Sequence, residues 1–441
     1  MHRFRPRCFP RRSAAQRFKA ARPLRYGRPN RYNMPIRHLP LTDMTPMTSA
    51  AVEDYHWLAG PEADVLLAEL AANKVPLHRA AQRLRRLVSD HRTRLVLELA
   101  ELRSRALAKF THADRMFFTR KSLEQATDSW IAKYKASRLA VRGPVADLCC
   151  GMGGDLLALA SHTQAVGVDR DAAMVVLAEA NLRARGLSAQ VHQADARQVE
   201  VENYAAWHVD PDRRFEDRRT SRVAAGEPSA EALEPMLLRN DTAAIKLAPA
   251  AVAPLDWQQR GEREWISRDR QCRQQVAWFG STATTPGQCR ATIVYNDERP
   301  PQTIVGKPAQ ALPLSSRVER FVFEPDPAVL AAGLCGHLAA TYQLQAVATG
   351  VAYLTANEPC AHALLSPFEV LEVLPLDMKR LRAVVRERRI GRLEVKKRAL
   401  SHDPADVLRQ LRPRGDEEAT LLLTPTSQGA RAILARRICK S

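Results

Sequence analysis

The chain has 441 residues, of which 45% are hydrophobic and 26% charged, and a formal net charge of +19, which predicts a globular protein of two or three domains. No run approaches about 20 uninterrupted apolar residues, so we expect no membrane span. The eight cysteines lack C-x-x-C pairs and matching histidine spacing, which argues against a metal site and a secreted disulfide scaffold and favours a reducing compartment, the cytoplasm.

The first segment, residues 1–48, is predicted to be a basic leader. Its first forty residues hold twelve of the 67 Lys and Arg and no acidic residue, so they contribute +12 of the net +19. We favour a disordered leader, with Met34, Met44 or Met47 as the true start, over a mitochondrial transit peptide or an RNA-binding arm. The remaining +7 fits either a polyanionic partner such as RNA or an Arg-rich composition without such a partner.

A helical module is expected over residues 49–139. Apolar residues recur there at helical spacing among many charged ones. The pattern predicts amphipathic helices over residues 62–70, 80–88 and 92–110, and a further helix that ends near Leu139.

The most informative stretch is VADLCCGMGGD at residues 145–155, within a segment expected to span residues 140–299. An apolar strand that contains Asp147 runs into a turn with three glycines and then into a helical pattern. Glycine adopts positive φ and lacks a Cβ that would block a ligand, so this turn predicts a small-molecule cradle at a helix N-terminus. A plain turn is the alternative. The candidate ligand-binding residues are Asp147, Cys149, Gly151 and Gly153.

Acidic residues follow the next three strands of this series. A strand over residues 165–169 ends in Asp169, about 20 residues after the first, where related folds place an acid against ribose hydroxyls. A strand over residues 189–192 leads to Asp195, and one over residues 206–209 opens into Asp210-Pro211-Asp212-Arg213-Arg214. One such acid is usually a turn or cap residue. Several in register predict a ligand site at the edge of a parallel, Rossmann-like α/β sheet.

The rest of the chain is expected to complete this sheet and to form a second domain. Further strands are predicted over residues 243–247 and, antiparallel, 290–295, and a Pro-rich linker over residues 300–320 should lead to an α+β domain over residues 321–441. In this domain we expect helices over residues 326–338, 378–388, 404–411 and 430–437 and strands over residues 368–373, 392–396 and 419–423. The ten Lys and Arg from Lys379 to Arg398 form either a phosphate-binding face or a solvated helix surface.

Six motifs, in order along the chain, resemble those of bacterial class I S-adenosylmethionine-dependent methyltransferases that end in a THUMP-like domain. They are Leu123-Glu-Gln-Ala-Thr127, Asp147-Leu-Cys-Cys-Gly-Met-Gly-Gly-Asp155, Val209-Asp-Pro-Asp-Arg-Arg214, Glu264-Trp-Ile-Ser267 with Trp278-Phe-Gly280, Glu324-Pro-Asp-Pro327 and Leu393-Glu-Val-Lys-Lys-Arg398. The resemblance extends from about residue 55 to the C-terminus. The methyltransferase part is also similar, more distantly, to cap-trimethylguanosine synthases.

The resemblance implies a fold, a cofactor and a substrate class. The fold would be a Rossmann-like class I methyltransferase sheet with a helical N-terminal module and a C-terminal α+β THUMP-like domain. The cofactor would be S-adenosylmethionine, with Asp169 at its ribose and Asp195 at its adenine. Because THUMP domains belong to tRNA-modifying enzymes, the implied partner is structured RNA, tRNA or rRNA.

The segment after the fourth strand supplies the candidate catalytic residues Asp210, Pro211 and Arg213. In the fold that the resemblance implies, it lies beside the transferred methyl group, where Asp210 would accept a hydrogen bond from an exocyclic amine and Arg213 would pair with a phosphate. The segment departs from the pattern of amino-group methyltransferases, which carry Asn or Asp, then two prolines and an aromatic residue. We expect methylation of a base nitrogen; an inactive S-adenosylmethionine- or RNA-binding protein and a small-molecule methyltransferase are the alternatives.

Overall fold

The structure, a computed structural model, describes residues 49–72, 77–139, 142–212, 214–215, 218–219 and 226–438. The basic leader expected over residues 1–48 and the candidate residue Arg213 lie outside the described residues.

Helices come first along the described chain. They are α1 (Ser49–Leu58), α2 (Pro61–Ala72), α3 (Leu77–Leu84), α4 (Asp90–Ala106), α5 (Arg120–Gln125) and α6 (Ser129–Arg138). The helices predicted over residues 62–70, 80–88 and 92–110 correspond to α2, α3 and α4. The longest, α4, begins where the Ser89 side chain accepts the Arg92 N–H, and it buries Val96, Leu99 and Leu102 at helical spacing.

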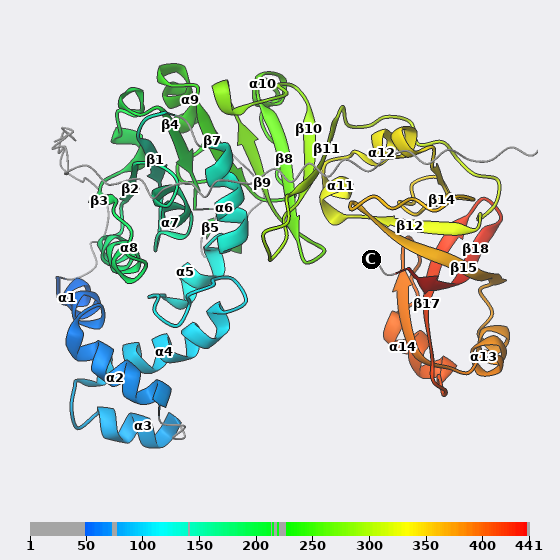
Figure 1. Ribbon diagram of the computed structural model, residues 1–441, viewed down its shortest axis with the longest axis horizontal. Coiled ribbons are helices and arrows are strands. Elements are labelled where there is room, and N and C mark those ends of the chain that lie inside the picture. Colours follow the sequence, from blue (N-terminus) through cyan, green and yellow to red (C-terminus); the bar gives the residue numbers. More distant parts are fainter. Residues whose placement is uncertain are drawn as a thin grey trace, which may run out of the picture. The chain divides into compact units, whose positions relative to one another are not determined.

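A nine-stranded sheet follows, with the order β11-β10-β8-β9-β7-β4-β1-β2-β3 (Figure 1). Its strands are β1 (Val145–Leu148), β2 (Ala165–Asp169), β3 (Gln190–Gln193), β4 (Ala206–Val209), β7 (Ala243–Leu247), β8 (Glu262–Arg268), β9 (Gln271–Trp278), β10 (Cys289–Ile293) and β11 (Gln302–Gly306). The run from β3 to β7 is parallel, as predicted for a Rossmann-like sheet. A two-stranded ribbon, β5 (Arg214–Phe215) and β6 (Arg218–Arg219), lies between β4 and β7 in the chain.

The antiparallel strand next to β7 is β9, and the expectation that residues 290–295 would take this place is wrong. Those residues form β10, which runs parallel to β8. The sequence does not mark the Glu262–Trp278 stretch as a hairpin, because its many charged and polar residues obscure the alternation that is typical of a strand. The last strand, β11, lies in the stretch expected to be a linker and pairs with β10.

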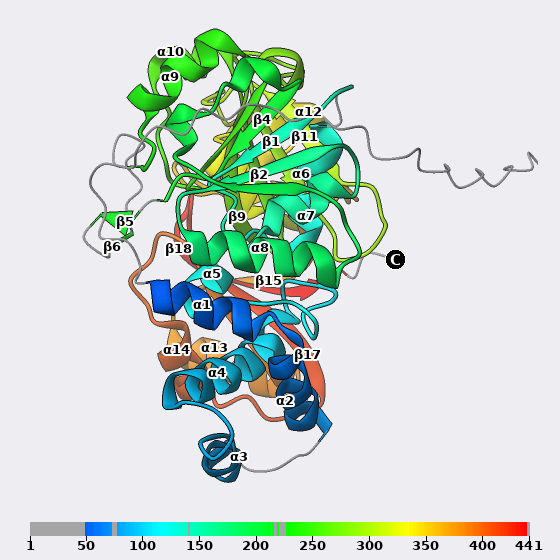
Figure 2. The ribbon, with the colours of Figure 1, turned by 90° about the vertical axis from the view of Figure 1, so that its left-hand side faces the viewer.

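Helices cover both faces of this sheet (Figure 2). On one face α6, α7 (Gly154–Ala160) and α8 (Ala172–Ala184) share a core with Val145. On the other face α9 (Ala230–Arg239) and α10 (Leu255–Arg260) share a core with Ala146 and Leu148. Successive residues of β1 thus enter different cores, which is why its sequence is a continuous apolar run broken only by Asp147. Short 3-10 turns follow β3, at Ala196–Gln198 and Val201–Asn203, and β9, at Gly280–Thr282.

The C-terminal part forms a seven-stranded sheet with the order β13-β14-β12-β15-β18-β17-β16. The strands are β12 (Phe321–Pro325), β13 (Gln345–Ala346), β14 (Leu354–Ala356), β15 (Leu365–Pro375), β16 (Ile390–Lys397), β17 (Glu417–Thr426) and β18 (Gly429–Arg437). The helices are α11 (Pro327–Ala331), α12 (Cys335–Tyr342), α13 (Met378–Glu387) and α14 (Pro404–Leu411). The helix predicted over residues 326–338 divides into α11 and α12 at Gly333, whose φ of +68° ends the first helix.

The helix predicted over residues 430–437 is wrong, because these residues form β18. Their Ala, Leu and Arg content favours a helix, but β18 lies between β15 and β17 and is paired on both sides. Ala432 and Leu434 enter one apolar core, and Ile433 and Ala435 enter another. Burial on both faces hides the period-2 pattern of the strand.

The two sheets share an apolar core. Trp265 of β8 and Ile304 of β11 belong to the same cluster as Phe323 of β12 and Val329 of α11. Beside this core, Ser267 Oγ donates a hydrogen bond to Asp326 Oδ1 at 2.5 Å, and Asp326 also caps α11. The described end of the first sheet and the start of the second are therefore packed as one body.

Candidate active site

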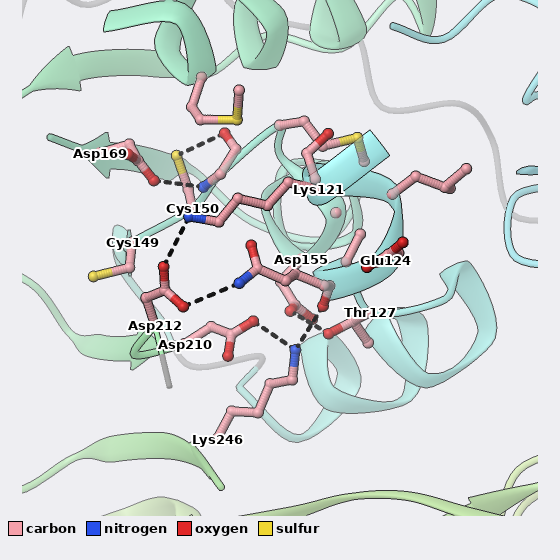
Figure 3. A pocket seen from close by; sticks show the side chains of 18 of the residues that line it. Lys121, Glu124, Thr127, Cys149, Cys150, Asp155, Asp169, Asp210, Asp212 and Lys246 are labelled. Atoms are coloured by element: carbon pink, nitrogen blue, oxygen red, sulfur yellow. Dashed lines mark hydrogen bonds and ion pairs between the residues drawn. The ribbon is translucent and has the colours of Figure 1, made fainter. Parts of the chain in front are cut away.

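A cavity of about 1640 Å³ opens at the carboxyl ends of the parallel strands (Figure 3). Its wall is formed by the turns after β1, β2, β3, β4 and β7, by the segment from α5 to the start of α6, and by the first residues of β9. This edge of an open parallel sheet is where ligands of such folds bind. The volume exceeds the 300–1,000 Å³ or so that is typical of a site for one small molecule, so it has room for two ligands.

The glycine-rich turn forms one side of the cavity. Cys149, Gly151 and Gly153 have positive φ values of 56°, 54° and 91°. A Cβ built on Gly151 would have no neighbour within 4 Å, because this residue faces open space. Gly153, which was expected to bind the ligand, is not among the residues that line the cavity; it precedes α7 and lies against Ala178. Burial raises the pKa of the Cys149 thiol, so this cysteine is not an activated nucleophile.

Asp169, at the end of β2, joins two turns at the cavity wall. Its Oδ2 accepts the Gly151 N–H at 2.7 Å, and its Oδ1 accepts the Asp171 N–H at 2.9 Å. Burial raises the pKa of Asp169, although both backbone donors favour its ionised form. The carboxylate therefore holds the glycine turn in place and lines the cavity as well.

Asp195, which follows β3, also lines the cavity. Its Oδ1 accepts the Arg197 N–H at 2.9 Å, and its Oδ2 pairs with the guanidinium of the same arginine at 2.5 Å. The hydrogen bonds from Arg197 lower the pKa of Asp195, so it is an anion near neutral pH. The structure thus shows it as a helix-cap residue at the cavity wall, and its contact with adenine stays a prediction.

Asp210, after β4, forms an ion pair that the sequence did not indicate. Lys246 Nζ of β7 lies 2.5 Å from Asp210 Oδ2 and 3.3 Å from the carbonyl oxygen of Gln125. The Lys246 side chain is 5% exposed and that of Asp210 is 23% exposed, and both residues line the cavity (Figure 3). The available signal was a single lysine in the otherwise apolar run Ala243-Ala-Ile-Lys-Leu247.

The next residues of this segment are held by α5. Pro211 lines the cavity, and Asp212 Oδ2 pairs with Lys121 Nζ at 3.1 Å while its Oδ1 accepts a hydrogen bond from Gln125 Nε2 at 3.0 Å. Of the expected catalytic residues, the structure thus brings Asp210 and Pro211 to one cavity.

A buried polar chain lies beneath the glycine turn. Asp147, which is 1% exposed, lies opposite His208 in the register of β1 and β4, and its Oδ1 is 2.7 Å from His208 Nδ1. Lys135 Nζ is 3.0 Å from His208 Nε2 and 2.8 Å from Asp155 Oδ1, and Asp155 Oδ2 accepts a hydrogen bond from Thr127. Because an ammonium only donates, His208 Nε2 accepts from Lys135 and Nδ1 carries the hydrogen.

The two carboxylates of this chain differ in their electrostatics. Burial raises the pKa of Asp147. Asp155 is also buried, but Lys135 outweighs this effect and holds the pKa of Asp155 well below its ordinary value. Asp147 Oδ2 and Gln274 Nε2 are buried polar atoms with no hydrogen-bond partner among the described residues, and both residues line the cavity. They are the polar atoms here that a ligand would satisfy.

The motif that begins at Glu264 is structural. Glu264 on β8 is fully buried and accepts hydrogen bonds from Tyr134 and Trp278 at 2.6 and 2.9 Å. Arg138 pairs with both Glu264 and Glu262 at 2.8 and 2.9 Å. Arg290 adds a pair with Glu262 at 2.6 Å, and although burial opposes ionisation, these arginines lower the pKa of Glu262 to about 2.

The motifs that begin at Glu324 and Leu393 meet each other. Glu324 of β12 is 2.5 Å from Lys396, 2.8 Å from Arg270 and 3.2 Å from Arg398. These cations outweigh the effect of burial and lower the pKa of Glu324. Lys396 and Arg398 were expected on a phosphate-binding face, but the structure engages both with this carboxylate.

Other cations of the expected face remain available. Arg388, Arg389 and Arg392 form surface ion pairs. Five exposed cations of this face have no acidic partner among the described residues. They are Lys379, Arg380, Arg386, Lys397 and Arg382, the last of which donates to the Gln410 carbonyl oxygen. Within the described ranges, no group of three or more His, Cys, Asp or Glu could hold a metal ion. None of the described helices is long and apolar enough to cross a membrane.

Comparisons with known proteins agree with this architecture. A family model described as a methyltransferase domain matches residues 145–209, and one described as THUMP domain-like matches residues 365–437. Proteins from two strains of Mycobacterium tuberculosis, each described as an S-adenosylmethionine-dependent methyltransferase, are 30% identical over 365 residues, which is 78% of this chain and 96% of theirs. A crystal structure of a putative methyltransferase from Porphyromonas gingivalis W83 has the same fold, with a TM-score of 0.68 at 18% identity; the match covers 90% of this chain and all of that one.

Proposed function

The chain belongs to the S-adenosylmethionine-dependent methyltransferases that carry a C-terminal THUMP-like domain, and on this basis we propose that it methylates a base nitrogen of structured RNA, tRNA or rRNA, in the cytoplasm. The observation that carries the proposal is the cavity of about 1640 Å³. It has the glycine turn on one side and the Asp210–Lys246 pair on another, so a cofactor and an acceptor base fit together.

The residues of the cavity wall fit S-adenosylmethionine. The partnerless Asp147 Oδ2 suits the ammonium of the cofactor's amino-acid end, and the partnerless Gln274 Nε2 suits its carboxylate. Gly151 allows close approach of the backbone, and Asp169 and Asp195 would hold the ribose and the adenine. When bound, the cofactor supplies a methyl group on a positively charged sulfur. Transfer of this group depends chiefly on how closely the protein positions and aligns the acceptor.

The C-terminal part would contribute RNA binding. Lys379, Arg380 and Arg386 of α13, together with Lys397, are exposed cations without acidic partners among the described residues. Phosphate contacts of this kind bind RNA without reading its sequence and weaken as salt rises. The THUMP-like match over residues 365–437 includes all four.

The proposal is tested by comparing nucleosides. RNA from a strain that lacks the gene would be digested and its nucleosides compared with those of the parent by mass spectrometry. We expect one methylated base nucleoside to disappear and to return when the wild-type protein is supplied. An unchanged nucleoside profile, together with methyl transfer to a small molecule by the purified protein, would refute the RNA assignment.

The RNA-binding part is tested separately by fluorescence anisotropy with labelled tRNA. The double variant Lys379→Glu/Arg386→Glu should bind RNA at least tenfold more weakly at low salt and with a smaller salt slope. The control Arg83→Glu/Arg85→Glu makes the same change in net charge on and just after α3 and should leave the affinity within about twofold. Equal losses in both variants would show a general charge effect and no binding face.

A further inference from the structure

Lys246 is a buried cation at the cavity to which the proposed function gives no chemical step. Its Nζ has three hydrogens, of which Asp210 and the Gln125 carbonyl take two. The third is available to a ligand, because Lys246 lines the cavity. With a side chain only 5% exposed, this cation is held in a fixed place with little water around it.

Asp210 likewise has one position open to a ligand. Its Oδ2 is taken by Lys246, while Oδ1 has no hydrogen-bond partner among the described residues. The neighbouring carboxylate, Asp212, is bound by Lys121 and Gln125. The wall therefore presents one ammonium N–H beside one carboxylate oxygen, a donor next to an acceptor.

The position of this ammonium distinguishes between two kinds of base nitrogen. An exocyclic amine attacks as a neutral group and becomes positively charged as the new bond forms, which a buried cation nearby opposes. A hydrogen bond from Lys246 to the adjacent ring nitrogen would also draw electron density away from the amine. An imide-type ring nitrogen, N1 of guanine or N3 of uracil, must instead lose its proton to attack, and its negative charge spreads to the adjacent carbonyl oxygen. A fixed ammonium stabilises that charge.

We infer, on the basis of the proposed function, that the acceptor is an imide-type ring N–H of guanine or uracil. Lys246 would donate a hydrogen bond to the adjacent carbonyl oxygen, and Asp210 would accept one from the N–H. The N–H bond breaks and its proton goes to Asp210 Oδ1. The electron pair that the broken N–H bond leaves on nitrogen forms the new N–CH₃ bond, and the electron pair of the broken C–S bond stays on sulfur. The proton then passes from Asp210 to water, which restores the carboxylate.

The product identifies the acceptor directly. Purified protein would be incubated with RNA and S-adenosylmethionine with a deuterated methyl group, and the labelled nucleoside identified by chromatography and mass spectrometry. We expect 1-methylguanosine or 3-methyluridine. A label on an exocyclic amine, as in N6-methyladenosine or N2-methylguanosine, would overturn this inference but leave the base-nitrogen function intact. A 2′-O-methyl nucleotide would overturn both.

Variants at Lys246 test its role with a second readout. Lys246→Met should lower kcat by about 10²-fold or more, the scale of a lost charge-stabilising donor. Its KM for RNA and its calorimetric affinity for S-adenosylhomocysteine should stay within about twofold, and Lys246→Arg, which keeps the cation, should recover part of the loss. The matched control is Lys133→Met, at an exposed position outside the cavity, which should have normal turnover.

The double variant Lys246→Met/Asp210→Asn covers the case in which a lone buried carboxylate prevents folding, because it removes both charges. It should fold, bind S-adenosylhomocysteine normally and lack activity. Wild-type turnover in Lys246→Met or in the double variant would overturn the inference.

Discussion

The substitution Gly151→Val separates the shape of the glycine turn from its position at the cavity. Gly151 has φ +54°, and Gly186, at the end of α8, has φ +62°; a Cβ at either would have no neighbour within 4 Å. A β-branched residue strains the backbone at such φ values by about 1–2 kcal/mol, so valine should cost the same stability at both sites. Only at Gly151 does the added side chain enter the space that the cofactor would occupy. We therefore expect Gly151→Val to weaken binding of S-adenosylhomocysteine at least ~10-fold, or about 1.4 kcal/mol, and Gly186→Val to leave it unchanged.

Two measurements check this expectation. Urea unfolding followed by tryptophan fluorescence gives the stability of both variants, and isothermal titration calorimetry with S-adenosylhomocysteine gives their affinities. Equal stability losses with an affinity loss only in Gly151→Val would match the structure. Unchanged affinity in Gly151→Val would refute the placement of the cofactor against this turn. An equal affinity loss in Gly186→Val would show that backbone strain away from the cavity lowers the affinity, so that the loss in Gly151→Val would not locate the cofactor.

Three further predictions follow from the site. Lys135→Met leaves a buried carboxylate without its ion-pair partner and should lower the free energy of unfolding by about 3–5 kcal/mol. The control Lys133→Met, at an exposed position on the same helix, should lower it by less than about 1 kcal/mol. Similar losses for the two variants in urea unfolding would contradict a stabilising role for the buried pair. Asp169→Ala should weaken S-adenosylhomocysteine binding about tenfold or more, measured by calorimetry. Asp171→Ala, which removes the cap of α8, should instead lower the free energy of unfolding by about 1 kcal/mol and change the affinity little. The pKa of Glu262 is about 2 in the folded chain against an ordinary 4.5, so its ionisation stabilises the fold above pH 4.5, and this contribution is lost as the pH falls toward 2. Glu262→Gln should therefore reduce the change in unfolding free energy between pH 4.5 and pH 2. An unchanged pH profile would show that the ionisation of Glu262 does not cause this change.

The sequence could predict the edge of the sheet at which the candidate site lies. Asp169, Asp195 and Asp210 each follow a strand of one parallel series, and parallel strands end at the same edge, so these residues line one cavity. The ion-pair partners of Asp210 and Asp155 could not be predicted, because Lys246 lies in an apolar strand and Lys135 in a helix, with no local motif. Each meets its carboxylate only after folding joins elements 20 or more residues apart.

Secondary structure was predictable where one face of an element is polar. The spans of α13 and α14 match their predicted ranges closely, because each has a capping Asp at its start and charged residues opposite its buried Leu and Val. The prediction failed at β18, whose residues are buried on both faces and whose composition favours a helix. Tertiary pairing decides the structure of such a segment, and local pattern does not.

The shared core at Trp265, Ile304, Phe323 and Val329 has a practical consequence for dissecting the protein. A truncation at residue 320, the end of the linker expected from the sequence, would leave apolar side chains of β8 and β11 exposed to water on one fragment and those of β12 and α11 exposed on the other. Each fragment would be prone to aggregate when expressed alone. Transplanting the C-terminal part onto another enzyme would require carrying β8 to β11 with it, so the unit of exchange is larger than the domain expected over residues 321–441.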